Sequence, residues 1–176
     1  LDVLGPCVYS TDGRAMEDVI GDLLRERGWS IAVAESCSGG LLASRLTDVA
    51  GSSDYFDRGV VSYSNRAKTE WLGVPAELIE ANGAVSEAVA RAMADGIRAR
   101  SGASVGIGIT GIAGPGGGTP EKPVGTVCIA VVTPNGGDVR RFTFIGPREM
   151  VKFQSTQAAM NMLRLHLSDG PSVYRD

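Results

Sequence analysis

The sequence is poor in the residues that most enzymes use for acid–base and metal chemistry. Among 176 residues there is one histidine, His166, and there are three widely spaced cysteines, Cys7, Cys37 and Cys128. A single histidine excludes any site that needs two of them. An odd number of cysteines without a C-x-x-C pair favours neither a disulfide framework nor a zinc site. If the protein is an enzyme, we expect a general base other than imidazole, and a reducing, cytoplasmic setting is the default.

Long apolar runs and a strong charge of one sign are also missing. No stretch approaches the about 18 consecutive apolar residues that a membrane helix requires, so we expect a soluble protein without a membrane partner. The formal net charge of −3 disfavours broad binding to nucleic acid. With 43% hydrophobic residues, the chain can build one core, and its length is that of one domain.

Glycine is abundant, with 24 residues, and the apolar pattern between the glycines alternates between helix and strand. Helical spacing predicts helices that begin at residues 16, 41, 65 and 76, after Ser86, and after Pro147. Strands are predicted over 30–34, 58–64, 103–109, 124–133 and 138–145, the last two as a hairpin around the turn 134–137. This order predicts an α/β fold: a three-layer α/β/α sandwich with a mixed sheet ending in an antiparallel hairpin.

The segment AESCSGG, residues 34–40, joins a predicted buried strand to a helix. Glycines at a helix start let a ligand approach the backbone, and the unpaired N–H groups there suit an anion or an oxyanion. Ser36 has the chemistry of a nucleophile, and the N–H groups near Gly39 and Gly40 are placed to meet an oxyanion or a phosphate. The alternative is an ordinary strand–helix turn in which Ser38 caps the helix.

Cys37, in the same segment, is also a nucleophile in principle. The one histidine lies on a late helix whose pattern is that of an amphipathic surface helix, so a Cys/His site is disfavoured.

A lysine offers the alternative base. In the segment YSNRAK, residues 63–68, Asn65 as N-cap would put Lys68 in the first helical turn, where the helix dipole and burial both lower the pKa of an amine. A lysine needs such a lowered pKa to act as a base near neutrality. Most lysines are instead exposed on surface helices, and that is the simpler interpretation. A polar loop before the preceding strand carries Ser53, so Ser53 is a second hydroxyl that could pair with Lys68, unless the loop is only a helix-ending turn.

The loop that begins at Thr110 is rich in glycine and follows a predicted strand, so it can wrap a phosphate or ribose or serve as a flexible crossing. Residues 106–111 match G-x-G-x-x-G. We reject a dinucleotide site, because the first two glycines lie inside the strand pattern and three prolines forbid the following helix. Arg148 opens the last helix and suits bidentate contact with phosphate or carboxylate, although a solvated arginine is commoner there. Ser36, Tyr63 and Thr110 all fall at or just after strand ends, the edge where open α/β sheets bind ligands.

Six segments together resemble the CinA C-terminal domain family: AESCSGG (34–40), DVAGSSDYF (48–56), GVVSYSNRAK (59–68), LGVP (72–75), GAVSE (83–87) and ITGIAGPGGGTPEKPVGTV (109–127). The resemblance covers roughly residues 16–166. It implies a nicotinamide-nucleotide amidase that hydrolyses the carboxamide of nicotinamide mononucleotide to nicotinate mononucleotide and ammonia, a step of pyridine-nucleotide recycling. It also implies a serine/lysine-type mechanism with no metal and no cofactor.

The resemblance carries functional roles onto particular positions. The implied catalytic residues are Ser36 or Ser53 as nucleophile, Lys68 as base, and Tyr63 to relay or orient the proton. Family members often have threonine where this chain has Ser38, which keeps the hydroxyl. The family's functional residues also fall on Thr110 and Arg148, which we expect to bind substrate. To these we add, as candidates of our own, Ser38, Gly39, Gly40, Asn65 and Gly111.

The resemblance also implies how the chain is organised. Residues 1–15 are expected to be a connector that follows a molybdopterin-binding-like domain, residues 16–168 the amidase domain, and residues 169–176 a tail. The expected partners are a small-molecule nucleotide and further copies of the chain in a homo-oligomer. Two alternatives stay open: a non-catalytic nucleotide-binding or regulatory module of a competence/damage-inducible protein, and an amidase acting on another carboxamide.

Overall fold

A computed structural model describes residues 8–168 of the protein. Residues 1–7, with Cys7 and part of the predicted connector, and the predicted tail 169–176 lie outside the described residues. Five strands form one sheet in the order β2-β1-β3-β4-β5. The first three strands of that order are parallel, β4 runs antiparallel to β3, and β5 runs antiparallel to β4. The strands are β1 (Ile31–Glu35), β2 (Phe56–Val61), β3 (Val105–Gly111), β4 (Thr126–Thr133) and β5 (Gly136–Thr143).

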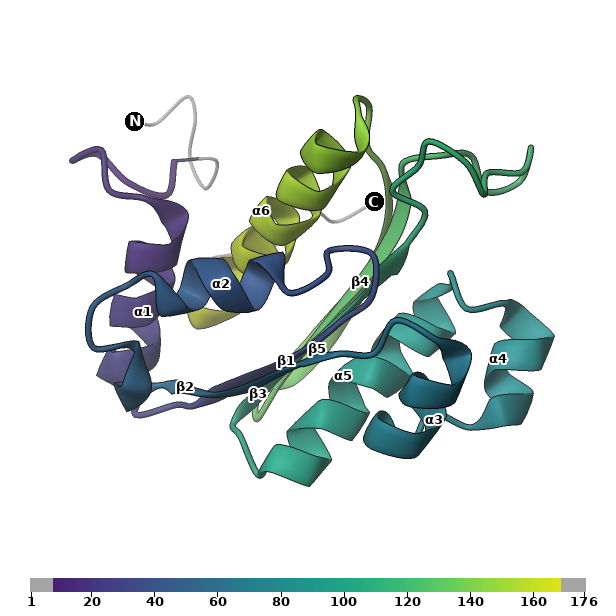
Figure 1. The fold of residues 1–176 in the computed structure, drawn as a ribbon. Coiled ribbons are helices and arrows are strands. Elements are labelled where there is room, and N and C mark those ends of the chain that lie inside the picture. The colour runs from purple at the N-terminus through teal and green to yellow at the C-terminus, as the bar shows by residue number, and fades with distance from the viewer. Residues whose placement is uncertain (1–7, 169–176) are drawn as a thin grey trace.

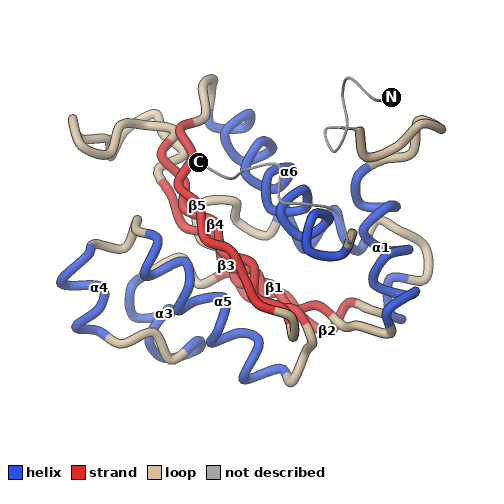
Figure 2. The backbone as a smooth tube through the Cα atoms, turned by 180° about the vertical axis from the view of Figure 1, so that it is seen from behind, coloured by secondary structure: helices blue, strands red, loops and turns tan. Residues whose placement is uncertain are grey.

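Helices cover both faces of this sheet (Figure 1), and the view from behind shows the same two helical layers (Figure 2). One face packs against α1, α2 and α6, and the other against α3, α4 and α5. The predicted three-layer sandwich with a mixed sheet and a terminal hairpin is therefore confirmed. The helices are α1 (Met16–Arg27), α2 (Leu41–Thr47), α3 (Asn65–Leu72), α4 (Ala76–Asn82), α5 (Glu87–Ser101) and α6 (Arg148–Leu167), with a short 3-10 helix η2 (Ser52–Asp54) before β2. Within the described residues, no helix combines the length and the apolar character that crossing a membrane requires.

Alternation along the central strands divides the core into two layers. Val33 of β1 points into the cluster under α1, α2 and α6, whereas Ala34 points toward α5. On the α5 side of β3 the residues are Gly106 and Gly108, and a Cβ on Gly108 would lie 2.3 Å from the Ala90 carbonyl oxygen. The first two glycines of the G-x-G-x-x-G match are thus packing positions inside a strand, which allow α5 to lie directly on the sheet.

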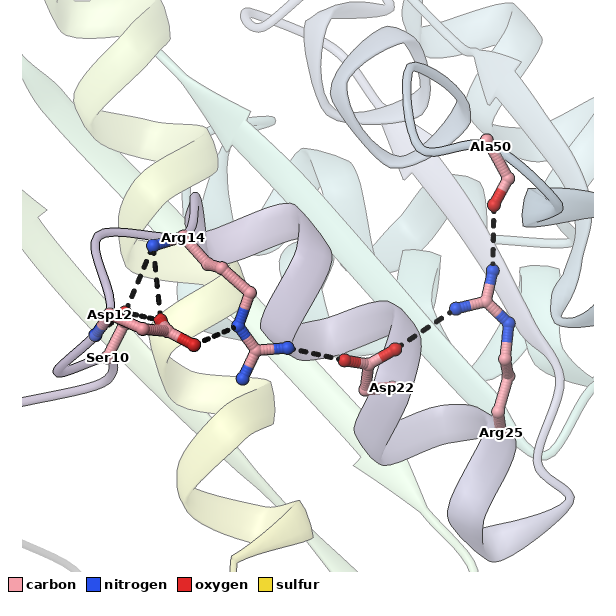
Figure 3. Close-up of polar contacts among 6 residues, drawn as sticks. All are labelled: Ser10, Asp12, Arg14, Asp22, Arg25 and Ala50. Carbon is pink, nitrogen blue, oxygen red and sulfur yellow. Dashed lines mark hydrogen bonds and ion pairs between the residues drawn. The ribbon is translucent and has the colours of Figure 1, made fainter.

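The segment before α1 is tied to the body of the protein by a chain of polar contacts (Figure 3). The Arg14 guanidinium contacts the Asp12 carboxylate at 2.8 Å and the Asp22 carboxylate at 2.6 Å. Asp22 also accepts from Arg25 at 3.2 Å, and Arg25 donates to the Ala50 carbonyl at 3.0 Å. Largely exposed ion pairs add little stability, but these contacts place the connection between α2 and β2 beside the end of α1.

The edge strand β2 differs from its predicted range of 58–64. It begins at Phe56 and ends at Val61. The shift arises because the Tyr55 carbonyl accepts from the Ile31 N–H at 2.7 Å, which starts the pairing with β1 two residues earlier. The exposed, polar residues Asp57 and Arg58 follow Phe56 and break the apolar pattern, so the sequence did not reveal the start of this edge strand.

The hairpin turn is tighter than the predicted 134–137. Thr133 pairs with Gly136 across the two strands, so only Pro134 and Asn135 lie between them. The two glycines therefore belong to β5 and do not form the turn itself.

Candidate active site

The parallel strands end at one edge of the sheet, and three of the predicted site residues meet there. Ser36 directly follows β1, Tyr63 follows β2, and Thr110 lies near the end of β3. The Ser36 N–H donates to the Ile109 carbonyl at 2.9 Å, which extends the pairing of β1 with β3 past the last strand residue. The sheet itself therefore fixes the position of Ser36.

Lys68 reaches this edge from α3, and its side chain is buried, with 1% of the residue exposed. Its Nζ lies 3.1 Å from Ser36 Oγ, 2.9 Å from the Ser62 carbonyl oxygen and 3.3 Å from the Tyr63 carbonyl oxygen. Burial lowers the pKa of the Lys68 amine. A neutral amine has two hydrogens and one lone pair. The two carbonyls can accept the hydrogens, and the lone pair is then left for the Ser36 hydroxyl.

The start of α3 corrects the predicted cap. Ser64, not Asn65, is the N-cap, and its Oγ accepts from the Ala67 N–H at 3.1 Å. Asn65 is the first helical residue, so Lys68 falls one position further into the helix than predicted. Burial, rather than the helix dipole, is the main cause of the lowered pKa.

A buried carboxylate organises the turn after β1. Glu35 is 1% exposed, and its side chain accepts hydrogen bonds from the N–H groups of Gly40 at 3.1 Å, Leu42 at 3.0 Å and Ala43 at 2.8 Å. It therefore satisfies the N–H groups at the start of α2 that would otherwise lack partners. Sequence reasoning missed this role of Glu35. The available signal was an acidic residue shortly before a Gly-Gly pair and a helix.

These contacts correct two predictions about the same turn. Ser38 does not cap α2, because the N-cap is Gly40 and the carboxylate takes the capping role. The Gly40 N–H is bonded to Glu35, and the Gly39 N–H donates to the Ser36 carbonyl at 3.2 Å. In this conformation neither N–H is available to an oxyanion or a phosphate. The Ser38 hydroxyl is fully buried and has no hydrogen-bond partner among the described residues.

The second candidate nucleophile lies elsewhere. Ser53 belongs to η2, before the amino end of β2, whereas Lys68 follows the carboxyl end of that strand. A six-residue strand spans about 20 Å, so the proposed pairing of Ser53 with Lys68 is wrong within one chain. Arg25 holds this loop at the far end of the sheet through Ala50 and through Asp54 at 3.4 Å.

Cys37 has neither the environment nor the partner of a reactive thiol. It is 5% exposed, and burial raises the pKa of its thiol to about 12. The Lys152 side chain on α6 lies beside Gly39, two residues after Cys37. His166 is on the same helix, about 21 Å further along its axis at 1.5 Å per residue. The described residues bring no imidazole to this cysteine.

Tyr63 and Arg148 link three elements at the mouth of the site. The Arg148 guanidinium donates to the Tyr63 hydroxyl at 3.0 Å and to the Gly114 carbonyl at 2.8 Å. The Tyr63 side chain is mostly exposed, and the residue contacts Lys68 through its main-chain carbonyl. The Tyr63 carbonyl thus orients the amine, whereas no hydrogen bond within the described residues joins the phenol to Lys68 or Ser36. The predicted role of the Tyr63 side chain in relaying or orienting the proton stays a prediction.

The remaining predicted residues have different surroundings. Thr110 is buried beside Ser36, and its hydroxyl donates to the Ala84 carbonyl at 2.8 Å. Gly111 is a packing position, because a Cβ there would lie 2.7 Å from Val127. Asn65 is exposed and lines a cavity of about 350 Å³ between α3 and α4.

The fold and this edge together define an α/β sandwich protein with a buried serine–lysine pair. The chain belongs to the CinA family, since the CinA C-terminal domain model matches residues 13–167. A CinA-like protein of Syntrophobacter fumaroxidans is 54% identical over 167 residues, which cover 95% of this chain and 39% of that protein. A CinA-like protein of Mycolicibacterium vanbaalenii is 56% identical over 164 residues, 93% of this chain and 38% of that protein. The chain thus spans about two-fifths of the length of these curated relatives.

Solved structures agree with this assignment. A CinA superfamily protein from Klebsiella pneumoniae superposes with a TM-score of 0.83 at 36% identity and covers 89% of this chain and 100% of that one. The competence/damage inducible protein CihA from Agrobacterium tumefaciens gives a TM-score of 0.80 at 39% identity over 92% of this chain and 99% of that one.

Proposed function

We propose that this chain is an amidohydrolase that converts nicotinamide mononucleotide to nicotinate mononucleotide and ammonia. The observation that carries the proposal is the 3.1 Å contact between Lys68 Nζ and Ser36 Oγ within a buried site. The substrate is the one that the family resemblance implies. Amide hydrolysis needs a nucleophile, a base that later protonates the leaving nitrogen, and donors for the tetrahedral oxyanion.

The Ser36–Lys68 pair provides the first two of these. Ser36 Oγ attacks the carboxamide carbon while the neutral Lys68 amine takes the hydroxyl proton. The resulting ammonium returns a proton to the amide nitrogen, the C–N bond breaks and ammonia leaves an acyl ester on Ser36. A water molecule then attacks the ester, with Lys68 again as base. Nicotinate mononucleotide is released, and both side chains return to their starting states.

The main chain supports this exchange of protons. The carbonyls of Ser62 and Tyr63 accept two hydrogens from Lys68 Nζ and so direct the third position of the nitrogen toward Ser36. That position holds the lone pair of the neutral amine and the transferred proton of the ammonium. The same two acceptors therefore serve both protonation states, and no reorganisation is needed between them.

The oxyanion requires donors other than Gly39 and Gly40, whose N–H groups are engaged. We assign it to the N–H groups of Cys37 and Ser38, which follow the nucleophile directly. Among the described residues no backbone carbonyl accepts from either of them. Both N–H groups face the buried Cys37 sulfur, a weak acceptor that an oxyanion would replace. The buried Ser38 hydroxyl, which has no hydrogen-bond partner within residues 8–168, is a further donor.

Three residues from the sequence analysis are assigned to substrate contacts. Thr110 lies beside Ser36 and can face the ribose through the lone pairs of its hydroxyl, because its proton is donated to Ala84. Arg148 supplies a guanidinium for the phosphate. Asn65 is the outermost of the predicted contacts, at the exposed start of α3.

Ammonia release tests the proposal directly. Purified chain is given nicotinamide mononucleotide, nicotinamide or NAD, and we expect ammonia from the first. Ser36→Ala should lower the rate of ammonia release by about 10³- to 10⁴-fold, whereas Cys37→Ala should retain it because the thiol is buried and neutral. Ammonia from another carboxamide alone would indicate an amidase of different specificity. Ammonia from none of them would favour a non-catalytic nucleotide-binding module.

A further inference from the structure

A lysine outside the proposed reaction chemistry lies against the turn that carries the nucleophile. Lys152 is half-buried on α6, and its Nζ lies 3.5 Å from the position that a Cβ on Gly39 would occupy. Gly39 has φ of 64°, a conformation that side chains other than glycine rarely adopt. The missing side chain leaves room for the ammonium next to the residues that follow Ser36.

Lys152 and Arg148 form one positively charged face at the start of α6. They are four residues apart, so their side chains lie on the same side of the helix. Arg148 spans the Tyr63 hydroxyl and the Gly114 carbonyl, and Lys152 lies over Gly39. The two cations therefore border the site beyond the ends of β1 and β2. The positive end of the α6 dipole has the same sign.

Neither of these two cations forms an ion pair with a carboxylate of residues 8–168. Ion pairs in the described part of the chain engage Arg14, Arg25, Arg45, Arg58, Arg66, Arg91 and Arg140, but none engages Arg148 or Lys152. The one carboxylate of the neighbouring turn, Glu35, is buried and already accepts from three N–H groups. A half-buried ammonium one helical turn from a guanidinium, with no carboxylate of the described residues paired to either, is suited to an anionic ligand.

We propose that Lys152 and Arg148 together bind the phosphate monoester of the substrate, which makes Lys152 a specificity-determining residue. The inference rests on the proposed function and deepens it, since it states which part of the nucleotide the enzyme recognises by charge. A monoester dianion offers three terminal oxygens, so it can contact both cations at once. A nucleoside or free nicotinamide offers no such group, and the phosphates of a dinucleotide carry only one charge each.

The test separates charge recognition from folding and from chemistry. Binding of nicotinate mononucleotide and of nicotinate riboside is measured by calorimetry, because the product is not consumed. Lys152→Met should weaken binding of the nucleotide by about ten- to a hundredfold, the range for one charge-assisted contact, and leave riboside binding unchanged. Lys152→Arg should restore part of the nucleotide affinity. Arg91→Met is the matched control, since Arg91 is an exposed cation on α5, on the other face of the sheet, paired with Asp95. It should change neither affinity.

The outcomes distinguish this inference from the proposed function. Equal losses for nucleotide and riboside in Lys152→Met, or no loss for either, overturn the phosphate contact even if the wild-type chain releases ammonia from nicotinamide mononucleotide. Conversely, Lys152-dependent nucleotide binding in a chain that releases no ammonia supports the phosphate contact and refutes the amidase.

Discussion

The two ends of the parallel strands carry similar residues in opposite environments. At the carboxyl end, Ser36 faces the buried amine of Lys68. At the amino end, Ser53 is exposed on η2 and the nearby cation, Arg25, is paired with the carboxylates of Asp22 and Asp54. A hydroxyl and a basic side chain occur at both ends. Only at the carboxyl end is the basic side chain buried and hydrogen-bonded to neutral carbonyls instead of carboxylates. The environment, rather than the residue types, therefore makes one serine a candidate nucleophile.

The largest effect should come from removing the amine at the carboxyl end. Lys68→Met keeps the buried volume without a base, and we expect kcat for nicotinamide mononucleotide to fall by about 10³- to 10⁴-fold. Ser36→Ala should cause a loss of similar size. The double variant should be no worse than either single one, because the two residues act as a unit. Steady-state ammonia release measures kcat for the three variants. Additive losses would show that Ser36 and Lys68 act independently, which would contradict a serine–lysine pair.

Next in size is the pH dependence. The Lys68 base must be neutral, and burial lowers its pKa. We therefore expect kcat/KM to rise about tenfold per pH unit below that pKa, and to level off at a pH below the about 10.4 of ordinary lysine. A pH–rate profile that still rises at pH 10 would contradict a lowered pKa.

The lowered pKa of Lys68 should also make the free energy of unfolding depend on pH. Below its folded pKa the buried amine is charged and costs stability, and this cost is relieved as pH rises toward the pKa of the unfolded lysine. Lys68→Met should therefore gain most over the wild type at low pH, with the gain shrinking at high pH. Denaturant unfolding at several pH values measures the difference.

A smaller effect is expected at the buried cap of α2. Glu35→Gln replaces a carboxylate that accepts three N–H bonds with an amide that brings donors of its own, and we expect the free energy of unfolding to fall by about 3 kcal/mol. The exposed Glu87 in the first turn of α5 gives a matched control. Glu87→Gln should lose less than about 1 kcal/mol. Equal losses in urea titrations would mean that burial of the cap is unimportant.

The smallest effect should be at the amino end. Ser53→Ala removes an exposed hydroxyl far from Lys68, so the free energy of unfolding should change by no more than about 0.5 kcal/mol. Ammonia release should stay near the wild-type rate. A severe loss of turnover with normal stability would show that Ser53 reaches an active site in some other way, for example in an assembly of several chains.

Most of the fold could be predicted from local patterns. The apolar faces of α1 and α5, the Ser86 cap and the glycines inside β3 all depend on neighbours in the sequence, and each is where the pattern puts it. The carboxyl-edge placement of Ser36 and Thr110 followed from strand order. The pairing of Ser53 with Lys68 failed because it ignored the length of a strand. Ser53 precedes β2 and Tyr63 follows it, so the two residues are close in sequence but lie at opposite ends of that strand.

The details of the turn could not be predicted for a related reason. Whether a capping oxygen comes from Ser38 or from Glu35 depends on how a buried side chain folds back over the helix start. Likewise, whether Ser64 or Asn65 is the N-cap of α3 depends on whether the helix begins one residue earlier or later after β2. Both candidates in each pair have suitable chemistry. The sequence narrows the capping residue to two nearby candidates, and the packing of the side chains decides which of them caps the helix.

The antiparallel return of β4 has a consequence for how this family can diversify. Ile112 and Gly125 close the intervening loop with paired main-chain bonds at its base, Ile112 N–H to Thr126 and Gly125 N–H to Ile112, each 2.8 Å. Because the loop leaves and re-enters the sheet at the same place, insertions or deletions within it leave every strand register intact. One rim of the candidate site at the carboxyl edge can therefore change in shape while the Ser36–Lys68 geometry stays the same.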